Sequence, residues 1–157
     1  MPIINSLDCP VSAHIRKMNP RGITSEIGNL LPNPADSQRH RLLRRGFAYG
    51  PPSPSTPYRP VEDGLDRGLV FLSYQTSIDE QFEFVVRRWA NEPNFPEQVS
   101  GYDPIIGQNN RNATRRRWFQ LGEGEAGRIS TTLEWVLPTG GGYYFAPGRH
   151  GLAHLVD

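Results

Sequence analysis

The sequence contains few of the residues that build disulfides or metal clusters, and it contains no long apolar run. Its single cysteine, Cys9, cannot form a disulfide within the chain, so cysteine usage indicates no redox compartment. Four histidines and one cysteine make a tetrahedral zinc cluster unexpected. No apolar stretch approaches the roughly 20 residues that span a bilayer, and the first residues lack the pattern of a signal peptide. The compartment therefore stays open.

The chain also lacks an excess of either charge. Its 17 basic and 16 acidic residues leave a formal net charge of +1, which gives no reason to expect binding to nucleic acid or to a membrane surface. The short basic run Arg115–Arg117 beside Trp118 is typical of a solvated loop rather than of a nucleic-acid contact.

Glycine and proline are abundant, with 16 and 15 residues, whereas apolar residues make up only 36% of the chain. This composition predicts a fold with long irregular connections. A length of 157 residues is that of one domain. We therefore expect a single domain over residues 1–157, with an exposed proline-rich excursion at about residues 51–66.

The strongest predicted elements are a strand over residues 68–74 and a helix from Ile78 to about Trp89. The strand is nearly continuous in apolar residues, which is typical of a strand buried on both faces. Ser77 or Asp79 would cap the helix. The apolar side chains of the helix recur at helical spacing and are expected on one face. They are Ile78, Phe82, Val85, Val86 and Trp89.

Weaker signals predict one short helix and four short strands in the rest of the chain. The helix is expected near residues 13–18, and the strands at 39–43, 118–121, 133–137 and 142–146. Because strands and helices do not alternate, the pattern favours the α+β class.

Six blocks of sequence occur in an order that resembles the dye-decolourising haem peroxidase family. They are residues 9–21, 43–50, 67–75, 80–84 with Trp89, 103–108 and 138–147. The resemblance implies the haem-carrying C-terminal half of such a peroxidase, with the N-terminal half absent. It implies a ferredoxin-like half of a dimeric α+β barrel, with an antiparallel sheet, one long helix and long loops. The implied cofactor is haem b.

The resemblance also assigns the two sides of the haem. His14 is implied as the proximal iron ligand, and a neutral imidazole there leaves the sixth iron position free for peroxide. Arg44 is implied as the distal arginine, whose permanent charge stabilises the anion that develops when the peroxide bond breaks. Arg45 is the alternative. Leu69 and Phe71 are implied as the apolar distal wall, which keeps the site dry.

A carboxylate that accepts the other ring N–H of the proximal histidine raises the basicity of the imidazole. The resemblance places this carboxylate on the long helix, where Glu83 is the better match and Glu80 the alternative. Arg16 and Arg21 are candidates to face the haem propionates.

Bulky dyes cannot reach the haem, so the resemblance implies electron transfer through aromatic residues at the surface. Tyr49 is the first candidate relay, and Trp89 and Trp118 are weaker ones. The expected partners are hydrogen peroxide and an aromatic reductant.

One departure from the family concerns the distal aspartate. Its Gly-x-x-Asp-Gly motif belongs to the N-terminal half and does not occur here, and Asp63-Gly64 lies in the proline-rich excursion instead. Two hypotheses follow. The chain is part of a haem peroxidase that needs the missing half, or it is a truncated, non-catalytic haem-binding or relic domain held in a homo-oligomer.

Overall fold

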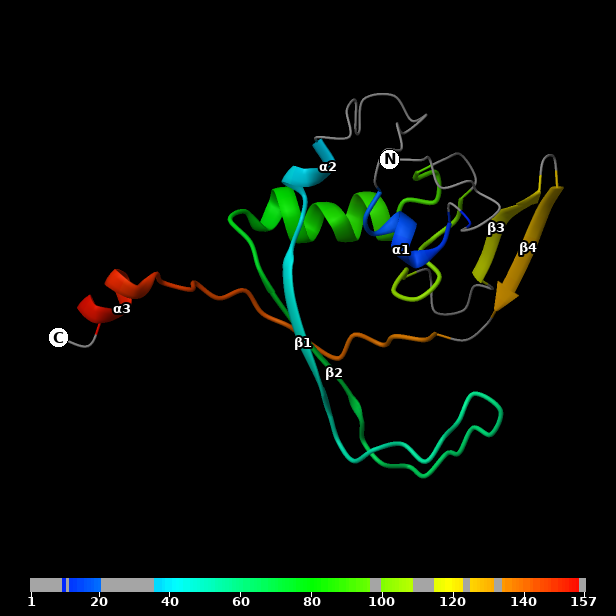
Figure 1. Cartoon of the computed structure of the whole chain (residues 1–157), viewed down its shortest axis with the longest axis horizontal. Helices are drawn as coiled ribbons and strands as arrows, with labels where there is room; N and C mark the ends of the chain where they lie inside the picture. Colours follow the sequence, from blue (N-terminus) through cyan, green and yellow to red (C-terminus); the bar gives the residue numbers. More distant parts are fainter. Residues whose placement is uncertain are drawn as a thin grey trace.

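The computed structural model describes residues 10, 12–20, 36–96, 100–108, 115–122, 125–131 and 134–155. In chain order the elements are α1 (His14–Lys17), α2 (Asp36–Arg39), β1 (Leu43–Tyr49), β2 (Gly68–Tyr74), η1 (Ile78–Glu83), η2 (Val85–Ala90), β3 (Arg115–Gly122), β4 (Glu125–Thr131) and α3 (Arg149–His154). The described strands form two antiparallel sheets of two strands each. These sheets lie at opposite ends of the helical stretch η1–η2, with α1 beside the end of η2 (Figure 1).

Strands β1 and β2 form a long antiparallel ribbon. Their register pairs Arg44 with Ser73, position 46 with Phe71, and position 48 with Leu69. Because directly paired residues share a face of a sheet, Arg44, Phe71 and Leu69 lie on one face of the ribbon. Tyr49 differs from Arg44 by an odd number of positions and therefore lies on the other face.

The ribbon is exposed, so the prediction of a β2 strand buried on both faces is wrong. The exposed fractions of Leu69 and Phe71 are 68% and 49%. The physical reason is that β2 pairs with β1 alone among the described strands, and a two-stranded ribbon cannot bury its own faces. The apolar run predicted the position of the strand correctly, but it did not predict its exposure.

The connection between the two strands, residues 50–67, is also exposed and is held by local contacts. Gly50 has a φ of +84°, and a Cβ there would lie 2.4 Å from the carbonyl oxygen of Asp66. The Arg67 guanidinium donates to the carbonyl oxygen of Pro51 at 2.7 Å and to the Asp63 carboxylate at 2.7 Å. One arginine therefore joins both ends of the connection.

The helix predicted from residue 78 begins where expected. The Ser77 hydroxyl accepts the Glu80 N–H at 3.1 Å, and the Gln81 side chain accepts the Ser77 N–H at 3.0 Å. The same Gln81 donates to the carbonyl oxygen of Arg41 at 2.6 Å, which ties the helix start to the start of β1. The hydrogen bonds within η1 and η2 are of the π type rather than the α type.

A small core lies at the far end of the helix. Val85, Trp89 and Phe95 are buried, and Met18 and Phe84 pack against them. The Trp89 ring stacks on Phe95 with centroids 5.7 Å apart, and the core thereby joins η2 to the following loop. Of the helices in the described ranges, none combines the length and apolar character needed to cross a membrane.

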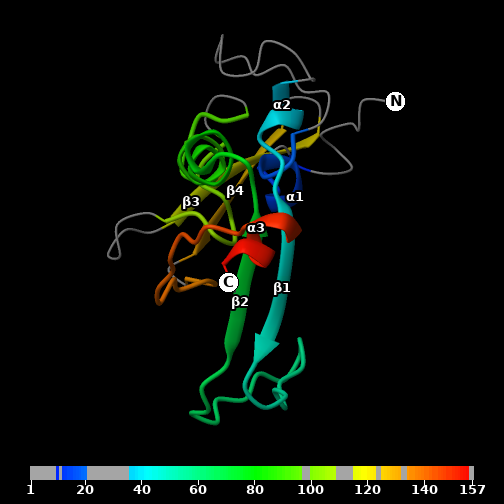
Figure 2. The same ribbon diagram turned by 90° about the vertical axis from the view of Figure 1, so that its left-hand side faces the viewer.

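The other predicted strands agree only in part with the strands of the structure. The strand expected at 118–121 lies within β3, whereas its partner β4 was not predicted. The strand expected at 39–43 is found instead at Leu43–Tyr49. The predictions of strands at 133–137 and 142–146 are wrong, because residues 134–148 contain no strand. These residues form an extended arm that leads away from the ribbon to α3 (Figures 1 and 2).

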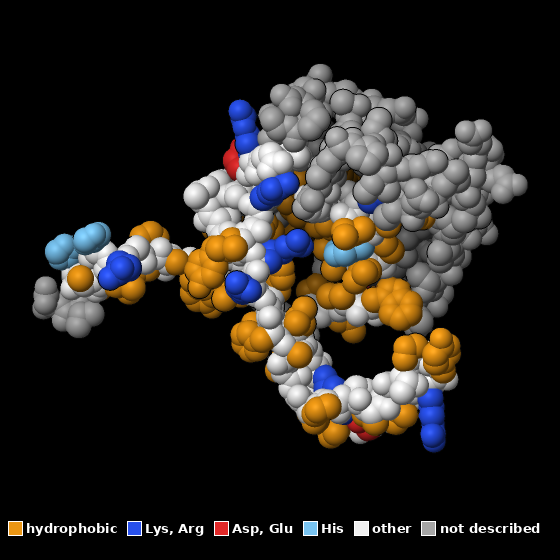
Figure 3. Space-filling view, viewed as in Figure 1, with side chains coloured by type: hydrophobic (Ala, Val, Ile, Leu, Met, Phe, Trp, Pro, Cys, Tyr) orange, Lys and Arg blue, Asp and Glu red, His pale blue; other side chains and the backbone are white. Residues whose placement is uncertain are grey.

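Apolar side chains gather along the ribbon and along this C-terminal arm, which we define as residues 134–155 (Figure 3). The largest exposed apolar side chains of the arm are Trp135, Leu137, Tyr143, Tyr144, Phe145, Leu152 and Leu155. Extended apolar surface of this kind is typical of a face that another polypeptide covers.

The Asp63–Arg67 pair predicts an unusual titration in the excursion. The side-chain hydrogen bond from Arg67, with help from the Leu65 N–H, lowers the pKa of Asp63 to about 2. Because the folded pKa is depressed, the ion pair persists as the pH falls and is lost only as it passes through about 2. Carbon-13 NMR titration of the Asp63 carboxyl measures this midpoint. Arg67→Gln should raise it toward the ordinary value of roughly 3.9, and an ordinary midpoint in the unmodified chain would contradict the geometry.

Candidate functional site

His14 and Asp103 form a hydrogen-bonded pair between α1 and the loop that follows η2. The His14 Nδ1 atom lies 2.9 Å from one Asp103 carboxylate oxygen and 3.0 Å from the other. The Asp103 side chain is fully buried, whereas about a third of the His14 side chain (32%) remains exposed. The pair therefore presents one side of an imidazole ring to the outside and keeps its carboxylate inside.

The backbone around Asp103 holds its carboxylate in place. One carboxylate oxygen accepts the N–H groups of Ile105 and Ile106, both at 2.9 Å. The Asp103 N–H itself donates to the carbonyl oxygen of Ala90 at 2.8 Å, which ties the residue to the end of η2. An aspartate that accepts from the residues after it is a common turn former, and this explains its place before Pro104.

The charge of Asp103 fixes the tautomer of His14. Burial by itself raises the pKa of the Asp103 carboxyl, but hydrogen bonds from His14 and from the Ile106 and Ile105 N–H groups outweigh burial and lower it. An ionised carboxylate can only accept, so in the neutral form of the His14 ring the proton lies on Nδ1 and the Nε2 lone pair is open to a ligand. A neutral imidazole with a carboxylate behind it is the donor that haem iron takes as its axial ligand.

The two carboxylates expected on the long helix have other described contacts. Glu83 forms an ion pair with Arg87 at 2.6 Å and accepts the Tyr143 hydroxyl at 3.1 Å. The alternative, Glu80, contacts His40 through its backbone carbonyl oxygen. The partner of His14 is Asp103, which comes from the loop after the helix. Residues 103–108 are one of the six blocks that carry the resemblance, but no role was predicted for Asp103.

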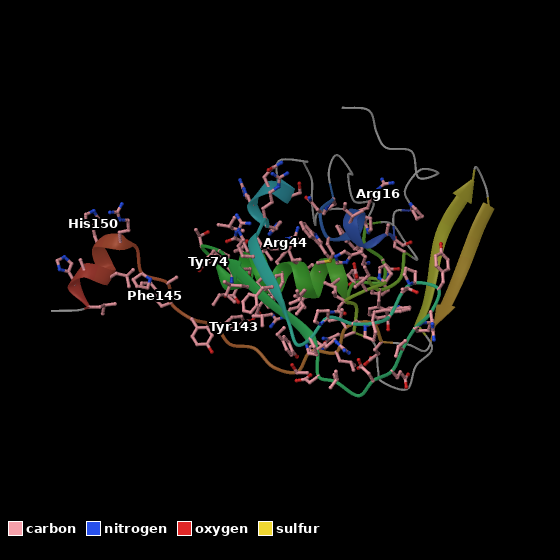
Figure 4. All side chains as sticks on the ribbon, turned by 60° about the horizontal axis from the view of Figure 1, so that its bottom comes forward. Arg16, Arg44, Tyr74, Tyr143, Phe145 and His150 are labelled. Atoms are coloured by element: carbon pink, nitrogen blue, oxygen red, sulfur yellow. The ribbon has the colours of Figure 1, made fainter. Side chains whose placement is uncertain are left out.

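The ribbon brings the three expected distal residues to one face. The strand register places Arg44, Leu69 and Phe71 on that face. The ring centroids of Phe71 and of Phe82 in η1 are 6.1 Å apart. Arg44 is exposed and has no hydrogen-bond or ion-pair partner within the described parts of the chain. Figure 4 shows it on β1 beside the helix. No hydrogen bond or ring contact among the described residues joins this trio to His14.

The remaining site predictions have different outcomes. Arg16 lies half-buried on α1, and Arg21 lies outside the described residues. Tyr49 lies on the ribbon face opposite Arg44, with its ring over Gly68 so closely that a Cβ there would come within 2.5 Å of it. A larger residue at position 68 would therefore force the Tyr49 ring to move.

Trp89, a weaker relay candidate, is buried in the core with an exposed fraction of 3%. Its indole N–H has no acceptor among the described residues. The side chain of Trp118, the other weaker candidate, lies outside what the structure describes. In the described ranges, no three His, Cys, Asp or Glu side chains group to hold a bare metal ion. A single imidazole is enough for haem iron.

Comparison with known proteins connects this site to one family. The family model "Dyp-type peroxidase, C-terminal" matches residues 10–109. The chain is 35% identical to the dye-decolorizing peroxidase msp1 of Mycetinis scorodonius, covering 98% of this chain and 31% of that protein. It is 34% identical to a multifunctional dye peroxidase of Amycolatopsis sp., covering 94% and 32%. The chain thus spans about a third of the length of these relatives.

Solved structures agree with the sequence matches. A DyP-type peroxidase of Anabaena sp. superposes with a TM-score of 0.63 at 34% identity, covering 80% of this chain and 26% of that one. A mutant dye-decolorizing peroxidase of Pleurotus ostreatus gives a TM-score of 0.63 at 30% identity, covering 83% and 29%. The expected ferredoxin-like α+β class is confirmed by this likeness.

The loss of stability on removing the Asp103 carboxylate, compared with the loss on removing that of Glu83, tests which of the two is the buried partner of His14. In Asp103→Ala, the His14 ring N–H and the Ile105 and Ile106 N–H groups lose their acceptor. Water can reach the partly exposed His14 ring, but each of the two loop N–H groups left without an acceptor costs roughly 1–3 kcal/mol, so we expect the free energy of unfolding to fall by about 2–6 kcal/mol. Urea unfolding measures the change.

Glu83→Ala is the matched control for this experiment. It removes a carboxylate whose partner Arg87 is mostly exposed, and such pairs contribute about 0–1 kcal/mol. Equal losses in the two variants, or a larger loss in the Glu83 variant, would contradict the assignment of Asp103.

Proposed function

The chain belongs to the Dyp-type peroxidase family, and from this premise we propose that it is the haem-binding part of a peroxidase. In this proposal hydrogen peroxide is reduced while an aromatic donor, such as a dye or a phenol, is oxidised. The observation that carries the proposal is the half-exposed His14 imidazole backed by the buried Asp103 carboxylate. The proposed cofactor is haem b, and His14 Nε2 is the atom that would bind its iron.

Asp103 and His14 act as one unit in this proposal. The carboxylate accepts the Nδ1 proton, holds the ring in one orientation and makes Nε2 a stronger electron donor. Because Asp103 is bonded to two backbone N–H groups, it cannot turn away from the ring without breaking those bonds. When bound, haem supplies the redox chemistry that connects peroxide with the donor.

Arg44 is proposed to stabilise negative charge on the peroxide side. It brings a permanently charged guanidinium to the ribbon face that also carries Leu69 and Phe71. Apolar neighbours exclude water, and in such surroundings a fixed positive charge acts more strongly on a developing anion. Arg45 lies on the opposite ribbon face, which supports Arg44 over its neighbour.

Electron transfer to bulky donors is assigned to Tyr49 in this proposal. The residue has an exposed fraction of 39% and lies on the ribbon face opposite Arg44. Arg16 and Arg21 are proposed to pair with the haem propionates.

The general acid–base step needs a group that we do not find in this chain. The Gly-x-x-Asp-Gly motif is absent from its 157 residues. The exposed apolar ribbon and the C-terminal arm support the proposal that another polypeptide covers them, either the N-terminal half or a second copy. The same surface favours a second candidate function, a non-catalytic haem-binding or oligomerisation domain.

Haem titration tests the axial ligand. The purified full chain should take up haemin with the Soret spectrum of a histidine-ligated iron, and His14→Ala should abolish that spectrum. The control is His150→Ala on α3, which removes an exposed histidine and should leave uptake unchanged. Uptake that survives in the His14 variant, or no uptake by the unmodified chain, would contradict the proposal.

Arg44→Leu should lower the peroxide-dependent oxidation rate of the haem-loaded chain. Removing one charge-stabilising donor typically costs about 10²–10³-fold in rate. Stopped-flow absorbance, with the N-terminal half of a relative added where needed, gives this rate. Arg45→Leu is the matched control and should change the rate by less than about 3-fold, since the charge it removes lies on the other face. If both variants lose the same activity, the assignment of Arg44 fails.

A further inference from the structure

The largest fully buried side chain described in this protein is a lysine, Lys17 of α1. Its ammonium group donates to the carbonyl oxygens of Gly101 at 2.6 Å, Glu92 at 2.7 Å and Phe95. It also lies 5.9 Å from the centre of the Phe95 ring. An ammonium has three N–H donors, and each of these three carbonyl groups can accept one of them.

The three carbonyl groups belong to the loop that delivers Asp103. Glu92 and Phe95 lie where the chain leaves η2, and Gly101 lies two residues before Asp103. The Gly101 N–H closes the loop onto the carbonyl oxygen of Pro93 at 2.7 Å. Lys17 therefore binds both the outgoing and the returning part of the loop, and it fixes the place at which the chain re-enters the core.

Lys17 also fixes the element that delivers His14. The two residues are three positions apart on α1 and so lie on neighbouring parts of one helical surface. A helix of four residues has no stability of its own, so contacts with the rest of the protein must orient it. His14 contacts the loop at Asp103, and Lys17 contacts the same loop two residues earlier.

We propose that Lys17 is a positioning residue for the His14 imidazole. By binding three carbonyl groups of one loop, it sets the distance and orientation between the ring and the Asp103 carboxylate. The inference rests on the proposed function only where it takes the imidazole to bind haem iron. The positioning itself belongs to the chain without haem.

Proton NMR of the haem-free full chain tests this inference directly. A ring N–H bonded to a buried carboxylate gives a separate downfield resonance, which is assigned by its loss in His14→Ala. Lys17→Met keeps the apolar length of the side chain but removes the ammonium. We expect the resonance to disappear or to move upfield in that variant, and haemin affinity to fall about 10-fold, in the range seen when groups behind a metal ligand are changed.

Val85→Ala is the matched control, because it weakens the same core without touching the loop carbonyl groups. A variant that merely destabilises the fold should leave the resonance where it is. An unchanged resonance in Lys17→Met would overturn the proposal, even if its free energy of unfolding had fallen. Loss of the resonance in both variants to the same degree would overturn it as well.

A chemical rescue covers the case in which Lys17→Met does not fold. Lys17→Cys, made together with Cys9→Ser, is alkylated in denaturant with 2-bromoethylamine and refolded, which restores an ammonium of nearly the same length. The neutral comparison is the same variant alkylated with an iodoalkane of matched length. Recovery of the resonance with the charged group alone supports the proposal, and equal behaviour of the two products, or no recovery with the charged one, overturns it.

The two readouts separate this inference from the proposed function. If Lys17 controls the resonance but the unmodified chain takes up no haemin, the positioning role stands and the peroxidase proposal fails. If haemin binds through His14 but the resonance is unchanged in Lys17→Met, the positioning role fails and the peroxidase proposal stands.

Discussion

A buried carboxylate behind a half-exposed imidazole is the interaction on which the rest of the site depends. Asp103 stays ionised inside the protein because three N–H groups donate to it, one of them from His14. That charge decides which ring nitrogen keeps the proton and which one is open to a ligand. The short helix α1, the core at the end of η2 and the loop after it together place these two side chains.

The described part of the chain has a small core and leaves much apolar surface exposed. Its described core consists of a few side chains around Trp89, whereas the β1–β2 ribbon and the C-terminal arm remain largely exposed. A chain that spans about a third of its relatives fits this picture, since the relatives have further residues with which to cover such faces. Under the proposed function, Arg44 on the ribbon face would belong to a site that other groups complete.

Much of the fold could be predicted from local patterns, and part of the site could not. The helix starting at Ile78 and the β2 strand follow from capping residues and apolar runs, which act over a few residues. The exposure of β2 depends on what pairs with it, and periodicity does not contain that information. His14 could be found because a motif surrounds it, whereas its partner Asp103 lies 89 residues away and is identified by three-dimensional contact alone.

The central claim is that Asp103 acts on the iron through the His14 imidazole. The iron–histidine stretching vibration of the reduced haem-loaded chain, measured by resonance Raman spectroscopy, reports this most directly, because it rises as the imidazole gains electron density from a carboxylate behind it. The account predicts a lower frequency in Asp103→Asn than in the unmodified chain, with haem still bound. The same frequency in both proteins would contradict it.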